Sequence, residues 1–204
     1  GDFLHYDSLD AVTPLSKHVV DSDTRYRLLQ RVAIRSIRNI IYMMLEKYPN
    51  VIISMTEGNH DLTGAGWLTE MFDAFYENEK RITVITNPNP FHAMQWGKCM
   101  VGWTHGHKKG FEASDVVIAG MYPEIFGLTK FRYLHTGHLH SKATKETSLM
   151  QSEQHNTMSS PDAYSSTSGY VSQRSANVIS YHTDFGEVGR QRLTPDLVKQ
   201  LVQE

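Results

Sequence analysis

The stretch VIISMTEGNHD, residues 51–61, decides how the fold of this chain is predicted. Its first five residues form a short apolar run rich in β-branched side chains, which is typical of a buried strand. The polar residues 56–61 follow at once and are therefore expected on the loop that leaves the strand. The same arrangement occurs twice more, because residues 104–107 (THGH) follow the apolar run 98–103, and residues 135–140 (HTGHLH) follow the run 131–134.

Helical and strand patterns alternate along the chain. Apolar side chains recur at helical spacing in residues 28–45, after the favourable N-caps Ser22 and Asp23, and again in residues 67–75 and 114–125. Strands are predicted at residues 51–55, 82–85, 91–95, 98–103, 131–134, 141–151, 177–183 and 187–193, and a last helix at 197–203. The runs 91–95 and 98–103 are expected to pair as a hairpin. This alternation predicts an α/β fold.

Composition excludes several classes of protein. With 204 residues, 40% hydrophobic and 21% charged, the chain fits one globular domain and excludes wholesale disorder, collagen and coiled coils. Its apolar runs are far shorter than the roughly 20 residues needed to cross a bilayer, so no membrane partner is expected. The single cysteine, Cys99, cannot form an internal disulfide, which favours a cytoplasmic location. Because the chain starts at Gly1 and no signal segment precedes it, we expect an N-terminus that is processed or truncated.

Candidate metal ligands lie at the predicted strand exits. They are oxygen or imidazole donors, namely Asp2, Asn59, His105, His138 and His140. Such exits converge at one edge in sheet-based folds, so these residues are expected to form one site. A carboxylate, a carboxamide and three imidazoles suit manganese, iron or zinc better than calcium or magnesium. If residues 137–140 are extended, both imidazoles of that segment point the same way.

Taken together, the motifs resemble those of the calcineurin-like metallophosphoesterases. Gly1-Asp2-Phe3-Leu4-His5 is similar to the second motif of that family, Gly58-Asn59-His60-Asp61 to the third, His105-Gly106 to the fourth, and Gly137-His138-Leu139-His140 to the fifth. Residues 1–8 also resemble phage-encoded members described as DNA-repair exonucleases. The resemblance implies a four-layer α/β/β/α sandwich that lacks its first strand, in a single domain over residues 1–204. It also implies two metal ions in a complete parent protein, with manganese favoured and iron, zinc or nickel open.

The resemblance further implies roles for individual residues. Asp2 would bridge the two ions, Asn59, His105 and His138 would complete one site, and His140 would belong to the other. The reaction implied is metal-assisted hydrolysis of a phosphoester. His60 would be the general acid, Asp61 would orient it, and His5 matches a histidine near the leaving group in some nuclease members. By contrast, His107 and His135 are predicted to be bystanders, and His155 is predicted to be an ordinary surface or core residue.

A row of arginines stands out on the long predicted helix. Arg27, Arg31, Arg35 and Arg38 are spaced by four, four and three residues, which aligns them on one helical face. A solvated face is the simpler interpretation of this stripe, and contact with nucleic-acid phosphates is the alternative. The net charge of −2 means that any polyanion must be held by such a local patch.

Three functional hypotheses follow from the sequence. The first is a phosphodiesterase or nuclease acting on nucleic acid, and the second is hydrolysis of a small phosphomonoester or nucleotide. The third is a non-catalytic binding module that keeps the family fold with a degraded metal site. The sequence leaves homo-oligomerisation open.

Overall fold

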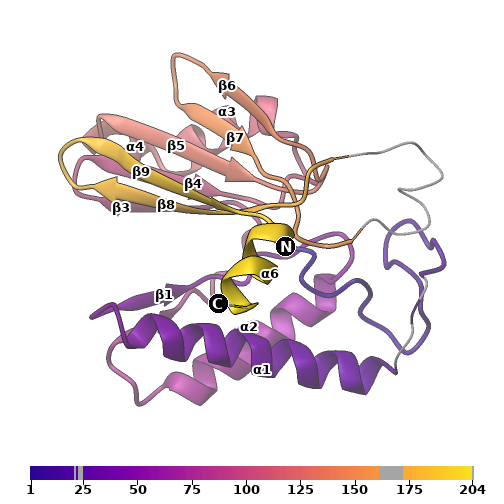
Figure 1. Ribbon diagram of the computed structural model, residues 1–204. Coiled ribbons are helices and arrows are strands. Elements are labelled where there is room, and N and C mark those ends of the chain that lie inside the picture. The colour runs from indigo at the N-terminus through magenta and orange to yellow at the C-terminus, as the bar shows by residue number, and fades with distance from the viewer. Residues whose placement is uncertain (21, 23–24, 161–171, 204) are drawn as a thin grey trace. The chain divides into compact units, whose positions relative to one another are not determined.

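A computed structural model describes residues 1–20, 22, 25–160 and 172–203 of the protein. The chain forms two compact units, Gly1–Pro90 and Phe91–Glu204, and each has its own sheet and core (Figure 1). The single domain expected over residues 1–204 stays a prediction. In the part of the chain that is described, no helix is long and apolar enough to cross a membrane.

The first unit packs two helices on a small parallel sheet. Helix α1 (Tyr26–Leu45) and helix α2 (Leu62–Tyr76) pack on the same face of the sheet formed by strands β1 (Val51–Ile53) and β2 (Ile82–Val84). The core consists of buried apolar side chains from α1, β1 and α2, namely Ile41, Val51, Ile53, Leu68, Phe72 and Tyr76. Alternation along β1 turns Val51 and Ile53 inward, as the sequence predicts.

The start of α1 differs from the prediction. The N-cap position is occupied by Arg25, which makes no side-chain capping bond, and Ser22 lies before it. The other predicted cap, Asp23, is outside the described residues. Stability of α1 therefore comes from its packed apolar face and not from a capping side chain.

The second unit contains a mixed five-stranded sheet. Its strands are β3 (His92–Trp96), β4 (Cys99–Trp103), β5 (Phe131–Thr136), β6 (Ala143–Glu146) and β7 (Gln151–Gln154), in the order β3-β4-β5-β7-β6. The predicted hairpin is confirmed as the antiparallel pair of β3 and β4, while β4, β5 and β7 pair in parallel. The strand predicted at 141–151 is instead two strands, because the Thr147 hydroxyl accepts the N–H groups of Leu149 and Met150 and turns the chain.

The two faces of this sheet are covered by different elements. Helices α3 (Phe111–Met121) and α4 (Pro123–Leu128) pack on one face, where Met100, Ile118, Leu134 and Met150 form the core. They replace the single helix predicted at 114–125, since a residue before proline is disfavoured in the helical conformation and the helix breaks at Tyr122.

The other face carries the antiparallel hairpin of β8 (Ala176–His182) and β9 (Gly186–Leu193). The backbone N–H of Glu187 donates to Tyr133 Oη at 2.9 Å, and the thiol of buried Cys99 donates to the His182 carbonyl at 3.2 Å. Helix α6 (Pro195–Gln203) follows the hairpin. The α/β class predicted from the sequence is confirmed, and each unit contributes helices packed on a sheet.

Candidate functional site

A buried carboxylate organises the motif loops of the first unit. Asp61 is 1% exposed, and its Oδ1 accepts the N–H groups of Asp2 at 3.1 Å and Gly58 at 3.0 Å. Its Oδ2 accepts the N–H groups of Phe3 at 2.7 Å and Leu4 at 3.0 Å. Three of these four charge-assisted bonds therefore tie the N-terminal segment to the loop that follows β1, and the fourth, from Gly58, lies within that loop. This role differs from the predicted one, which was to orient His60.

The ring of His60 is oriented by a backbone carbonyl. Its Nδ1 lies 3.0 Å from the carbonyl oxygen of His5, and the two imidazole rings stack at 5.4 Å between centroids and 16° between planes. A carbonyl oxygen only accepts hydrogen bonds, so Nδ1 carries the hydrogen and Nε2 is the nitrogen that gains or loses a proton. His5, which is exposed, is thus placed beside the predicted general acid.

Asp2 and Gly58 fit together closely. The Asp2 carboxylate accepts the backbone N–H of His60 at 2.9 Å. A Cβ atom on Gly58 would collide with both the carboxylate and the backbone nitrogen of Asp2, so only glycine allows this approach. Asn59, half-buried, lies between these two contacts on the same loop.

The second unit brings three histidines together at the ends of two parallel strands. The N–H of Thr104 donates to the His135 carbonyl at 3.1 Å, and the N–H of Gly137 donates to the His105 carbonyl at 2.9 Å. These bonds hold the two strand exits side by side, and the rings of buried His105 and half-buried His138 approach to 5.2 Å between centroids. The convergence expected for these two histidines is therefore observed.

His107 belongs to the same cluster. Its ring centroid lies 5.3 Å from that of His105 and 6.3 Å from that of His138. The prediction that His107 is a bystander stays a prediction, although its ring lies beside those of the two predicted ligands. The intervening Gly106 has φ of 107°, and this left-handed turn brings the second imidazole of the His-Gly-His segment back toward the first.

Left-handed backbone is concentrated at predicted metal ligands. Among the described residues, the non-glycine positions with positive φ are Asp2 (54°), Lys17 (56°), His138 (71°) and His140 (54°). Residues 137–140 are therefore not extended, so the condition under which both imidazoles would point the same way is not met, and His140 is exposed. Each such position costs on the order of 1 kcal/mol and is usually retained where function requires it.

The arginine stripe is only partly available to a ligand. Arg27, Arg31 and Arg35 are exposed on α1. Arg38 instead stacks its guanidinium over the Phe75 ring at 4.6 Å and donates to Tyr42 Oη at 3.0 Å. It therefore packs α1 against α2, and the basic surface is reduced to three side chains.

Comparisons with known proteins give few matches. No protein-family model and no curated protein matches this sequence. The chain is similar to solved structures of Vps29 from Entamoeba histolytica, of which the wild-type protein complexed with Zn²⁺ is 16% identical with a TM-score of 0.33. That similarity covers 57% of this chain and 66%, just under two thirds, of the other.

Two mutant structures of the same Vps29 extend the comparison. A single mutant is 14% identical, with a TM-score of 0.40 over 76% of this chain and 88% of that chain. A double mutant is 13% identical, with a TM-score of 0.38 over 91% of this chain and 95% of that chain. Because these TM-scores lie below 0.5, the function proposed below rests on the residues and contacts of this chain and not on these structures.

We expect Asp61→Asn to destabilise the first unit by roughly 2–4 kcal/mol, because the new NH₂ group must face two N–H donors that lose their acceptor. The measurement is the free energy of unfolding in urea. Asp73→Asn, on the exposed surface of α2, is the matched control and should change stability by less than about 0.5 kcal/mol. Equal effects of the two substitutions would show that Asp61 does not organise the loops.

Proposed function

We propose that this protein is a metal-dependent phosphoesterase of the calcineurin-like type, and that its substrate is a phosphodiester in nucleic acid. The observation that carries the proposal is the left-handed backbone at Asp2, His138 and His140, three residues that the motifs independently nominate as metal ligands. A strained conformation at several residues of one motif set is the pattern expected when backbone geometry serves a ligand.

The donor chemistry of the motif residues fits a divalent transition metal. Asp2 and Asn59 offer oxygen atoms, and His105 and His138 offer imidazole nitrogens from rings that already lie together. One oxygen of Asp2 accepts the His60 N–H, but a carboxylate has about four lone-pair sites, so further ligation is compatible with this bond. A bound metal would polarise the phosphoryl group and lower the pKa of a coordinated water.

His60 is suited to donate a proton to the leaving oxygen. The bond from its Nδ1 to the His5 carbonyl fixes the ring, so that Nε2 presents the transferable proton in a defined direction. The stacked ring of His5 keeps one side of the imidazole covered. Proposed roles are therefore general acid for His60, positioning for His5, and organisation of both loops for Asp61.

Positive charge on α1 favours a nucleic-acid substrate. Arg27, Arg31 and Arg35 are exposed on one helical face of a chain whose net charge is −2. A local row of cations of this kind is what a nearly neutral protein needs to hold a phosphate backbone.

Metal dependence and substrate choice test the proposal together. The chain is treated with a chelator, resupplied with Mn²⁺ or Zn²⁺, and assayed on a chromogenic phosphodiester, a chromogenic phosphomonoester, and single-stranded and double-stranded DNA. We expect the metal-loaded protein to hydrolyse the diester and DNA, and we expect the chelator to abolish both activities. Hydrolysis of the monoester alone would instead support a small-molecule phosphatase, and metal binding without any hydrolysis would support a binding module.

We expect His60→Ala to lower turnover by about 10²–10⁴-fold while metal content stays unchanged, because a general acid acts on the leaving oxygen and not on the ion. The loss should shrink for diesters with good leaving groups, which need less protonation. Turnover is measured on a series of leaving groups, with metal content determined in parallel. An equal loss across the series would contradict the role of His60 as a general acid.

We expect Arg31→Gln and Arg35→Gln to weaken DNA binding and to flatten the slope of log affinity against log salt by about 0.7–0.9 for each phosphate contact removed. Hydrolysis of the small diester should be unaffected. Arg81→Gln serves as control, because Arg81 pairs with Glu79 outside the stripe. An unchanged slope in the stripe variants would identify the stripe as a solvated helix face.

A further inference from the structure

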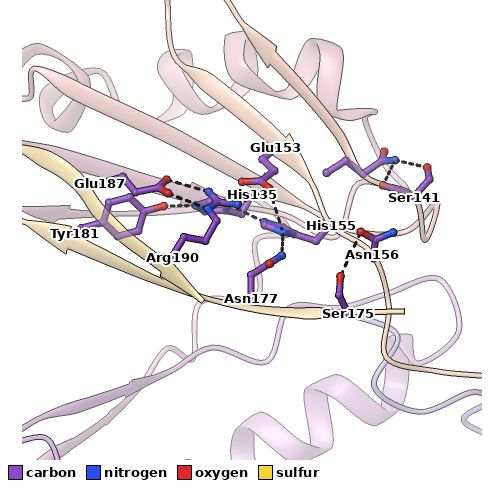
Figure 2. Close-up of polar contacts among 11 residues, drawn as sticks. His135, Ser141, Glu153, His155, Asn156, Ser175, Asn177, Tyr181, Glu187 and Arg190 are labelled. Atoms are coloured by element: carbon purple, nitrogen blue, oxygen red, sulfur yellow. Dashed lines mark hydrogen bonds and ion pairs between the residues drawn. The ribbon is translucent and has the colours of Figure 1, made fainter. Parts of the chain in front are cut away.

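A second group of potential metal ligands lies in the second unit, on the sheet face under the β8–β9 hairpin. His135 of β5 and Glu153 of β7 are partners in the parallel register, so their side chains are neighbours on one face. His155 follows Glu153 by two residues and therefore returns to that face. The His155 N–H donates to the Thr136 carbonyl at 2.8 Å, which continues the strand pairing. Figure 2 shows His135, Glu153 and His155 grouped beside Tyr181 and Arg190.

The ligand atoms of this group are close together. His135 Nδ1 and His155 Nε2 are 2.8 Å apart, and one ligand atom from each of His135, Glu153 and His155 lies within 4.8 Å of the others. Zinc–nitrogen bonds of about 2.0–2.1 Å would place two nitrogens a little over 3 Å apart, so the rings would separate by only about half an ångström.

The outer atoms of both rings are held by hydrogen bonds. His135 Nε2 lies 2.6 Å from Tyr181 Oη, and His155 Nδ1 lies 3.1 Å from the amide nitrogen of Asn177. Partners of this kind fix the orientation of metal-binding histidines. With a metal ion bound at His155 Nε2, the ring proton would be on Nδ1. A flip of the Asn177 side-chain amide would then place its oxygen next to Nδ1, where it can accept a hydrogen bond.

Charge and protonation suit a cation. Burial lowers the pKa of His135 to about 4 and also lowers the pKa of His155. Arg190 bridges Glu153 at 2.5 Å and Glu187 at 2.9 Å (Figure 2). The two carboxylates and one guanidinium sum to a formal charge of −1, and the remaining lone pairs of Glu153 are available to an ion.

We propose that His135, Glu153 and His155 bind one divalent transition-metal ion, separately from the motif ligands. Two imidazoles and one carboxylate are a common ligand set for zinc, and such sites keep a further coordination position open. A pocket of about 290 Å³ is lined by His135 and His155 together with Asn177 and Tyr181, so there is space beside the two imidazoles for water or a small ligand. The site does not depend on the proposed phosphoesterase activity.

Zinc stoichiometry and affinity of the purified chain test the site. We expect His155→Ala to lose one equivalent of Zn²⁺ and Tyr181→Phe, which removes only an outer hydrogen-bond partner, to bind about 10–100-fold more weakly. His182→Ala is the matched control, because this exposed histidine lies on the same hairpin beside Phe185. The His105→Ala variant should still bind the zinc ion that the His155→Ala variant loses. This result would show that the proposed site is distinct from the motif ligands.

Nitrogen NMR of the histidine rings in the unchanged chain provides a test that needs no variant. Zinc should shift the signals of His135 Nδ1 and His155 Nε2, whether or not the motif histidines respond. Unshifted signals, or undiminished zinc binding by a folded His155→Ala chain, would overturn the proposal. The two rings would then be a structural pair joined by a hydrogen bond.

Discussion

The carboxylate of Asp61 is the interaction on which the first half of the motif set depends. Its four backbone donors come from two segments that are more than 50 residues apart in sequence. A buried carboxylate without such donors would be costly, and the two buried N–H groups of Leu4 and Gly58 would be costly without an acceptor. Donors and acceptor therefore require each other, and the left-handed conformation of Asp2 and the place of His60 both follow from this arrangement.

In the second unit the equivalent constraint is parallel strand pairing. Strands β4, β5 and β7 enter the sheet in the same direction, so their carboxyl ends lie at one edge. Residues that leave these strands must therefore meet, whatever loops connect them. The cluster around His105 and His138 and the group around His135 and His155 both arise from this pairing, on different sides of the same strand ends.

Local signals in the sequence were sufficient for much of the fold. The sequence predicts the hairpin around Trp96-Gly97 and the strand exits at His105 and His138. These features depend on alternating hydrophobicity and turn residues, which are signals that span only a few neighbouring positions. The partnership of His135 with His155 was missed, because it depends on the register between β5 and β7, which is set by the whole sheet. The positive φ of His138 and His140 was not predictable, because histidine adopts positive φ only in a small minority of cases, whereas glycine adopts it freely.

Cys99 gives the β8–β9 hairpin a built-in chemical reporter. It is the sole thiol of the chain, is fully buried, and donates to the carbonyl of His182 in the hairpin. A buried thiol of this kind is inert until it is uncovered. The rate at which a thiol reagent labels native protein therefore measures how often the hairpin lifts from the sheet, with no engineered probe.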